Sequence, residues 1–236
     1  MTVFAVDGDI LAFRMSVVCE NAPAVTELID GKMHQIAEHT GVQKYRIYLT
    51  GSGNFRNAIG VTKPYKGNRL AEKPEFLSEA RAYLRDKYAA VTVHGYEADD
   101  AIASDMVQNG AVHCGQDKDL HQISGEHYDL VTGEWLTITE DEALLNFYRQ
   151  ILTGDSTDNI PGLPGIGAKK AEKAIHDPET AIEDAKALYI EVCEKKLPDI
   201  DVATYWKEQV QLVQMVTTLN VLDMVTTTVK PKLLRI

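Results

Sequence analysis

Eight acidic residues fall in four short segments: Asp7; Glu97, Asp99 and Asp100; Asp117 and Asp119; and Asp155 and Asp158. Taken singly, each segment has an ordinary explanation, because acids often cap a helix N-terminus or shape a turn. Brought together without a metal, these carboxylates would repel one another. Hard cations such as Mg²⁺ or Mn²⁺ prefer such oxygen ligands, and two of them about 3.5–4 Å apart can support phosphodiester hydrolysis. The spacing therefore predicts a site for two divalent metal ions.

The elements that must position these acids alternate along the first part of the chain. Apolar runs predict strands at 2–7, 45–50, 91–94 and 111–114, and a hairpin at 128–131 and 135–139. Helical periodicity predicts helices at 24–39, 74–88 and 97–109. Such alternation indicates an α/β fold with a mainly parallel sheet. Ligands bind such sheets beyond the carboxyl ends of the strands, where Asp7 and Asp117 fall.

The second part of the chain is expected to be helical. A capping box formed by Thr139 and Glu142 begins a helix that runs to about residue 153. Further helices follow, with breaks at 155–167 and near Pro198. We therefore expect two domains, a catalytic α/β domain at 1–140 and a helical lobe at 141–236.

Residues 159–171, NIPGLPGIGAKKA, predict a helix–hairpin–helix motif that extends to about residue 176. Gly165 and Gly167 would let backbone N–H groups approach a phosphate, and a helix N-terminus adds positive charge. Lys169 and Lys170 follow within the same helix. A plain tight turn is the alternative, but the length of the pattern favours the DNA-binding motif.

A basic stretch lies between Glu38 and Glu72, where no acid occurs. Its cations are Lys44, Arg46, Arg56, Lys63, Lys66 and Arg69. Such a run is usually a solvated face, but here it contrasts with an acidic chain, and Tyr65 adds an aromatic ring for stacking. We interpret the stretch as a channel for the DNA backbone, with Arg56 and Lys63 among its contacts.

The overall charge first argues against a nucleic-acid partner, since it is −11. Setting aside the eight acids of the candidate site raises it to −3, and two divalent cations would bring it to about +1. No apolar run is long enough for a membrane span, the N-terminus lacks a basic signal region, and the three cysteines are scattered. These features predict a protein of the cytoplasm without a membrane partner. We further expect it to be a monomer in a bacterial or phage-infected cell.

Together, GYEADD (95–100) and the segment 154–167 resemble the flap endonuclease and 5′–3′ exonuclease family, which includes the 5′-nuclease domain of bacterial DNA polymerase I. The resemblance implies a PIN-like α/β domain and a helical lobe with the helix–hairpin–helix. It implies activity on DNA with 5′ ends or 5′ flaps, extending to RNA–DNA hybrids, and a K⁺ ion on the carbonyl groups of the hairpin.

The resemblance also implies residue roles. Asp7 and Asp99 would bind the first metal with support from Glu97 and Asp100. Asp117, Asp119, Asp155 and Asp158 would form the second-metal group, with Asp117 or Asp119 as a ligand that both could share. Lys66 and Arg69 would stabilise the scissile phosphate, Tyr65 would stack on the terminal nucleotide, and Arg14 would lie near the active site.

One departure concerns the end of the second strand, where the family usually has another aspartate and this chain reads TGSG at 50–53. Gly51 is expected to weaken the first metal site, and Gly51→Asp to lower the Mg²⁺ requirement. A backbone role for Gly51 is the alternative. Two other functions stay open: a catalytically weak DNA-structure-binding protein of the same fold, and a PIN-domain ribonuclease, against which the helix–hairpin–helix counts.

Overall fold

A six-stranded sheet forms the centre of the structure, a computed structural model that describes residues 2–69 and 72–227. Its strands are β1 (Phe4–Asp7), β2 (Tyr45–Thr50), β3 (Val91–Val93), β4 (Val112–Gly115), β5 (Gly125–Asp129) and β6 (Trp135–Ile138). They are ordered β3-β2-β1-β4-β5-β6. The first five are parallel, and only β6 runs antiparallel, against β5. The mainly parallel sheet expected from the sequence is confirmed.

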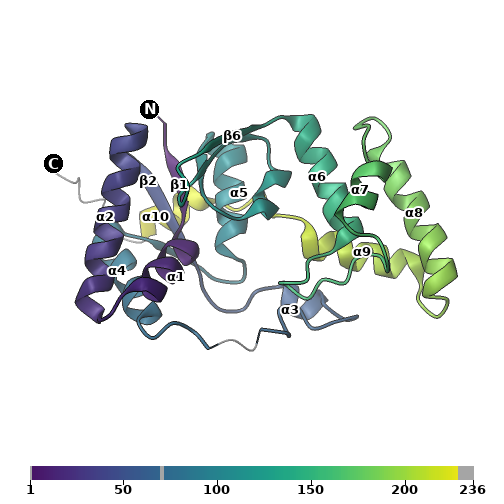
Figure 1. The fold of residues 1–236 in the computed structure, drawn as a ribbon, viewed down its shortest axis with the longest axis horizontal. Coiled ribbons are helices and arrows are strands. Elements are labelled where there is room, and N and C mark those ends of the chain that lie inside the picture. The colour runs from purple at the N-terminus through teal and green to yellow at the C-terminus, as the bar shows by residue number, and fades with distance from the viewer. Residues whose placement is uncertain (1, 70–71, 228–236) are drawn as a thin grey trace.

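Helices cover both faces of this sheet (Figure 1). One face packs against α1 (Gly8–Val18), α2 (Ala22–Thr40) and α4 (Leu77–Tyr88), and the other against α5 (Ala98–Asn109). Because side chains alternate along a strand, Phe4 and Val6 enter the first core while Ala5 enters the second. Both faces are therefore apolar, as expected for buried parallel strands.

The strand order reverses beside β1. The chain moves outward from β1 to β2 and β3, and then crosses to the other side of β1 to form β4. The carboxyl ends of β1 and β4 are thus neighbours at the point where open α/β sheets bind ligands. Asp7 ends β1 and Gly115 ends β4.

The helical lobe consists of α6 (Glu140–Thr153), α7 (Ala168–Ala174), α8 (Ala181–Lys196) and α9 (Val202–Val213). It has its own core, in which Leu152, Ile175 and Tyr189 are buried. The boundary expected at residue 140 remains a prediction, and residues 228–236 of the predicted lobe lie outside the described residues.

The chain then returns to the α/β layer. Val216 and Leu219 hydrogen-bond with the Ser104 hydroxyl of α5, and α10 (Val221–Thr227) packs beside that helix. In the described part of the chain, no helix combines the length and the apolar character that crossing a membrane requires.

Three described elements were not expected from the sequence: α1, α3 (Arg56–Ile59) and the 3₁₀ turn η1 (Lys118–Gln122). The helix α1 begins directly after β1, with no turn residue between them, because Asp7 caps it with its own side chain. The other two are single turns, too short to show helical periodicity.

Candidate active site

Asp7 lies at the centre of the acidic cluster. One of its carboxylate oxygens accepts hydrogen bonds from the backbone N–H groups of Asp9 and Ile10, each at 2.9 Å. Burial raises the pKa of Asp7 to about 7, against the opposing effect of the Ile10 N–H, and the charge of Asp117 adds to the rise. The charged form of this carboxylate would therefore be stabilised by a nearby cation.

The N-terminus of α5 brings two further acids to the same edge. Glu97 is the N-cap residue of α5, and Asp99 lies in its first turn. The pKa of Asp99 is raised well above its usual range by burial, then by the charges of Asp7, Asp117 and Glu97. These acids are therefore close enough to repel one another across the end of the sheet.

Two more segments complete the cluster. Burial raises the pKa of Asp119 to about 7, and the charges of Asp117, Asp155 and Asp158 contribute. The pKa of Asp117 is raised by burial, against a hydrogen bond from the Asp119 N–H, and then by Asp158 and Asp155. Seven of the eight predicted acids are thus linked electrostatically, although 151 positions separate Asp7 from Asp158 in sequence.

This arrangement fits divalent cations by its chemistry. The donors are all hard carboxylate oxygens, and their mutual repulsion is relieved by positive charge. Among the described residues, no group of three or more His, Cys, Asp or Glu side chains is arranged so that it could hold a metal ion as it stands. An open carboxylate cluster suits Mg²⁺, which keeps several water ligands, better than a cation that needs a full protein shell.

Lys66 supplies positive charge to this cluster. Its ammonium group donates a hydrogen bond to Glu97 and lies 3.3 Å from a carboxylate oxygen of Asp158. The backbone of Lys66 is left-handed, with φ of 54°, and its N–H donates to the carbonyl of Asp158 at 2.8 Å. The strained backbone places Lys66 between the two halves of the acidic cluster.

Two arginines flank the same acids. Arg69 is half exposed and donates to Asp158 at 2.6 Å. Arg14, on the exposed side of α1, donates to Gln116, which directly precedes Asp117. Both lie where the sequence predicts them, at the border of the acidic cluster.

The structure corrects the role expected for Arg56. Its side chain is only 1% exposed and makes a double hydrogen bond with Asp100, at 2.7 and 2.8 Å. It also donates to the carbonyl groups of Leu212 and Gln214. The prediction that Arg56 contacts DNA is wrong, because its guanidinium joins α3, α5 and the end of α9 inside the protein.

Because of its ion pair with Arg56, Asp100 does not face the other acids of the candidate metal site. Asp100 is fully buried, and its two oxygens also accept from the N–H groups of Glu97 and Val216. The structure therefore gives Asp100 a structural role instead of a place among the metal-supporting acids.

Tyr65 also differs from its predicted role. The residue is 7% exposed and its ring belongs to the core of the helical lobe. Its hydroxyl lies 2.7 Å from an oxygen of Glu97 and 2.7 Å from one of Asp158. Tyr65 is thus placed to orient the acids, and its ring is not available to stack on a nucleotide.

Gly51 has no room for a side chain. A Cβ atom at this position would lie 2.6 Å from the Val93 carbonyl oxygen and 2.7 Å from Nδ1 of His94. The Gly51 N–H donates to the same carbonyl at 2.7 Å. The close approach of β3 explains the glycine, so position 51 is not a vacant ligand site.

Two residues at this edge were missed by the sequence reasoning. Arg81 of α4 donates to Asp9 and to the carbonyl group of Thr50. Asp9 could have been found from the sequence, because it lies two positions after Asp7. Arg81 could not, because it lies 72 positions from Asp9 and belongs to no motif.

The hairpin forms as predicted. Gly165 has φ of 80°, and Gly167 is the N-cap residue of α7. Lys170 donates to the carbonyl of Gly165, and Lys196 of α8 to that of Pro164, both at 2.8 Å. Lys169 and Lys63 are exposed.

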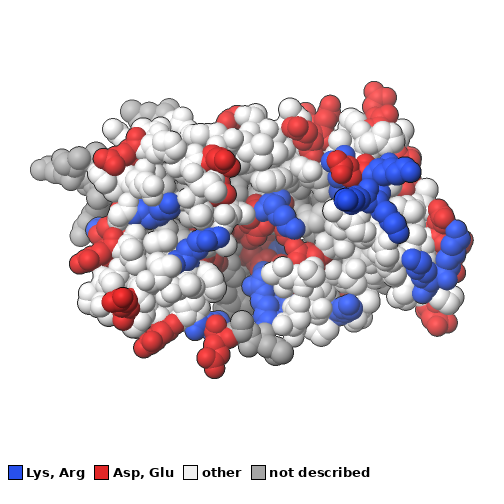
Figure 2. Space-filling view, viewed as in Figure 1, with Lys and Arg blue, Asp and Glu red and all other residues white. Residues whose placement is uncertain are grey.

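Figure 2 shows Lys and Arg side chains over α7 and α8, and acids in a hollow near the middle of the molecule with cations around them.

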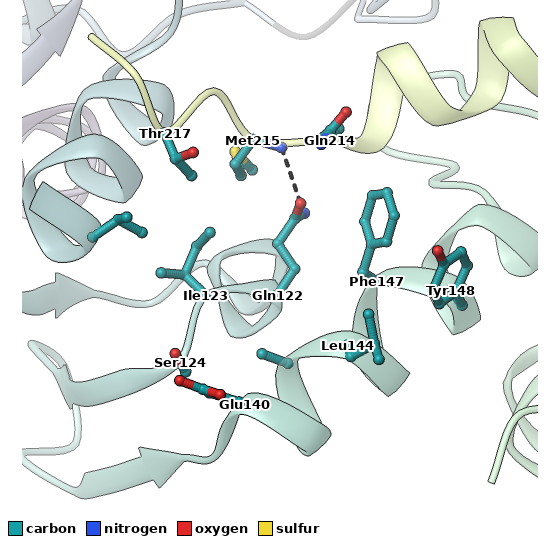
Figure 3. Close-up of a pocket in the computed structure, with 12 residues that line it drawn as sticks. Gln122, Ile123, Ser124, Glu140, Leu144, Phe147, Tyr148, Gln214, Met215 and Thr217 are labelled. Atoms are coloured by element: carbon teal, nitrogen blue, oxygen red, sulfur yellow. Dashed lines mark hydrogen bonds between the residues drawn. The ribbon is translucent and has the colours of Figure 1, made fainter. Parts of the chain in front are cut away.

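A larger hollow lies elsewhere. It measures about 440 Å³ and opens between Gln122, Phe147 and Met215, where the Met215 N–H donates to Gln122 (Figure 3). Among the described residues that line it, Glu140 is the only acid. A second hollow, about 340 Å³, includes Asp119 and Asp155. This smaller hollow therefore borders the acidic cluster on the side of Asp119 and Asp155.

Comparisons with known proteins give relatives of one kind. The chain is 30% identical over 187 residues to DNA polymerase I of Bacillus caldotenax. The match covers 70% of this chain and 21% of that protein. It is 33% identical over 156 residues to a 5′–3′ exonuclease of Bacillus subtilis, covering 55% of this chain and 50% of the relative. A flap endonuclease Xni of Shewanella amazonensis is 33% identical over 120 residues, covering 43% of this chain and 47% of the relative. The chain thus spans about a fifth of the polymerase and about half of the other two.

Among solved structures, the D15 protein of bacteriophage T5, crystallised with metal ions, has a TM-score of 0.73 at 19% identity and covers 97% of both chains. No protein-family model matches the chain. The polymerase and exonuclease relatives confirm the resemblance that the motifs indicate, and the phage protein confirms the PIN-like fold. This chain is a relative of the flap endonuclease and 5′–3′ exonuclease family and has its fold.

Proposed function

We propose that this chain is a divalent-metal-dependent nuclease that acts on DNA as a 5′→3′ exonuclease and flap endonuclease. The observation that carries the proposal is the convergence of acids from four segments at the point where the strand order reverses. Carboxylates in such a position, with raised pKa values, are typical of a site that binds metal ions and performs chemistry.

The acids divide into two groups. Asp7, Glu97 and Asp99 would hold one Mg²⁺ or Mn²⁺ ion, and Asp117, Asp119, Asp155 and Asp158 a second. Bound there, such ions supply an activated water and neutralise charge on the phosphate. Lys66 and Arg69 would orient the scissile phosphate, and Tyr65 would keep Glu97 and Asp158 in place.

Positive groups outside the cluster would hold the DNA. Lys63 is exposed beside the gateway segment Tyr65–Arg69, and the hairpin residues Gly165 and Gly167 with Lys169 and Lys170 would grip the duplex. A K⁺ ion on the hairpin carbonyls remains part of the proposal, with the condition that the Lys170 and Lys196 ammonium groups, which now occupy two of these carbonyls, move away.

The relatives support the substrate class. They are named 5′–3′ exonuclease and flap endonuclease, and a further T5 D15 structure is described as a flap endonuclease complex with DNA and metal ions. For this chain we propose DNA with 5′ ends or 5′ flaps as the substrate, and RNA–DNA hybrids as a further one. We also propose a monomeric state and a site of action in a bacterial or phage-infected cell.

The test is digestion of end-labelled flap DNA and a matched RNA, with Mg²⁺, with Mn²⁺ and with excess EDTA. We expect metal-dependent cleavage of the DNA near the base of the flap. Asp119→Asn and Asp155→Asn should each lower turnover by at least about 100-fold while retaining DNA binding, because they remove metal ligands and not phosphate contacts. Cleavage in EDTA, or full turnover in both variants, would contradict the proposal.

A second function is favoured by one observation, the absence of an acid at position 51, directly after β2. In that case the chain is a DNA-structure-binding protein with weak catalysis. The same assay separates the two, because this alternative predicts binding to flap DNA with negligible cleavage at any Mg²⁺ concentration. Preferential cleavage of the RNA would instead indicate a ribonuclease.

A further inference from the structure

The carboxyl end of β2 carries an ion pair between Arg81 and Asp9, while position 51 has no acid. Arg81 reaches this point from α4, and its two terminal nitrogens donate to Asp9 and to the carbonyl of Thr50. The other oxygen of Asp9 accepts from the Thr50 N–H at 2.9 Å. These three residues form a closed network, so the guanidinium is held from two sides.

This network adjoins the acidic cluster. The Asp9 N–H donates to Asp7, and the Thr50 hydroxyl accepts from the N–H of Ala98, the residue before Asp99. The positive charge of Arg81 lowers the pKa of Asp7, although burial raises it more. Arg81 therefore lies beside the acidic cluster, linked through Asp9 to the end of β1 and through Thr50 to the N-terminus of α5.

Arg81 keeps donors for a further partner. A guanidinium has five N–H donors, and the described residues provide hydrogen-bond acceptors for two of its nitrogens. The side chain is 23% exposed, so it is partly accessible to solvent. A planar guanidinium held by a carboxylate is well suited to bind a phosphate oxygen.

The chain cannot place a carboxylate at position 51, where β3 approaches too closely. Without a carboxylate at position 51, the first metal would be held less tightly and would supply less charge to the substrate. A fixed cation at the same edge would compensate by contacting the phosphate directly.

We propose that Arg81 contacts a non-bridging oxygen of the DNA phosphate at the cut, and that Asp9 is a positioning residue that holds the Arg81 guanidinium toward the site. This inference rests on the proposed nuclease function. It adds a phosphate contact from α4, a helix that no part of the sequence reasoning placed in the site.

The main test compares Arg81→Ala with Arg85→Ala, an exposed arginine one turn further along α4. Single-turnover cleavage of flap DNA should be about 100-fold slower in Arg81→Ala and unchanged in Arg85→Ala. Low concentrations of guanidinium ion should restore part of the rate in Arg81→Ala only. If Arg81→Ala does not fold, as judged by circular dichroism, Arg81→Gln carries the same test, because its amide can still donate to Thr50.

A second readout requires neither metal nor catalysis. In EDTA, the affinity of Arg81→Ala for DNA should have a salt dependence about one unit shallower than that of the wild type, which corresponds to one lost phosphate contact. Arg85→Ala should keep the wild-type slope. An unchanged slope in Arg81→Ala, or a slow rate that guanidinium does not restore, would show a purely structural role and overturn the inference.

Asp9→Asn separates positioning from metal binding. We expect cleavage about 10-fold slower, with an unchanged affinity for Mn²⁺ measured by calorimetry, because the amide weakens the hold on Arg81. A loss of Mn²⁺ affinity would make Asp9 a ligand and overturn its positioning role. If the wild type itself does not cut DNA, the proposed function fails; if it cuts and Arg81→Ala cuts equally fast, only this inference fails.

Discussion

The hydroxyl of Tyr65 lies 2.7 Å from Glu97 and 2.7 Å from Asp158, yet a phenol has one proton to donate. The two carboxylates therefore share this single donor. Lys66 approaches the same pair of acids. In the absence of a metal ion, these two adjacent residues therefore bring together two acids that would otherwise repel each other.

Gly51→Ala tests why this position lacks a side chain. The added Cβ would overlap the Val93 carbonyl, so the free energy of unfolding should fall by about 1–3 kcal/mol. Gly51→Asp should destabilise at least as much and should not lower the Mg²⁺ requirement, contrary to the expectation from sequence. Urea denaturation measures the first effect, and cleavage titrated with Mg²⁺ the second.

Gly31→Ala is the matched control, because a Cβ there meets no atom within 4 Å in the middle of α2. This change should be neutral or stabilise the helix by up to about 1 kcal/mol. If Gly51→Ala is as stable as Gly31→Ala, the explanation by close packing is incorrect.

Arg56→Ala should act on stability and not on DNA binding. It would leave the Asp100 carboxylate buried without its partner, which typically costs about 3–5 kcal/mol. Arg69→Ala, at an exposed position, should have little effect on the urea denaturation midpoint. A stable Arg56→Ala protein with weakened DNA affinity, measured by fluorescence anisotropy, would restore the role expected from sequence.

Charge patterns could not reveal this difference between residues. Arg56 and Arg69 belong to the same acid-free stretch, and only the fold shows that one is buried and the other exposed. The acids were more predictable, since Asp7 and Asp117 follow strands and the ends of parallel strands meet. Arg81 could not be found, because its contacts depend on how α4 crosses the sheet.

At the scale of elements, the segment Tyr65–Arg69 and the hairpin before α7 should contribute differently. Lys66→Ala should slow cleavage more than it weakens binding, because Lys66 would act on the scissile phosphate in the transition state. Lys169→Ala combined with Lys170→Ala should weaken binding and reduce its salt slope by about one unit per lost phosphate contact. Anisotropy in NaCl and single-turnover rates distinguish the two effects.

Lys195→Ala on α8 is a suitable control, because Lys195 is exposed and pairs with Glu191. It should change neither measurement. Identical behaviour of the Lys66 and the Lys169/Lys170 variants would contradict a division between the two elements.

Strands were easier to predict than their ends. The limits of β2 match the expected 45–50, because its apolar run is bounded by Lys44 and Gly51. For β5 the expected 128–131 lies too far along the chain. Leu130 is apolar and buried but belongs to the turn, whereas Gly125 and the charged Glu126 pair with β6 at the sheet edge.

For the whole molecule, stability should depend on pH and Mg²⁺ together. Asp7 and Asp119 have a pKa of about 7 in the folded protein, against 3.8 as the ordinary value. Between these limits the folded state binds more protons than the unfolded state, so their contribution to stability is present below pH 3.8 and is lost as the pH rises through 7. Mg²⁺ binding replaces those protons, so its stabilising effect should grow over the same range.

We therefore expect saturating Mg²⁺ to raise Tm more at about pH 8 than at about pH 5. Differential scanning calorimetry at both pH values measures this. Asp119→Asn should reduce the difference, because it removes one of the groups that exchange a proton for the metal. An equal rise in Tm at both pH values would show that these carboxylates do not take part.

The return of the chain to α5 after α9 also has a mechanical consequence. The helical lobe is attached to the α/β layer at α6 and again at Gln214, and Arg56 hydrogen-bonds to the carbonyls of Leu212 and Gln214 at the second attachment. We expect a lobe connected at two points to keep a constant separation between the hairpin and the acidic cluster. The number of base pairs between the duplex bound at the hairpin and the cleavage site would then be fixed. A flap substrate should accordingly be cut at one dominant position.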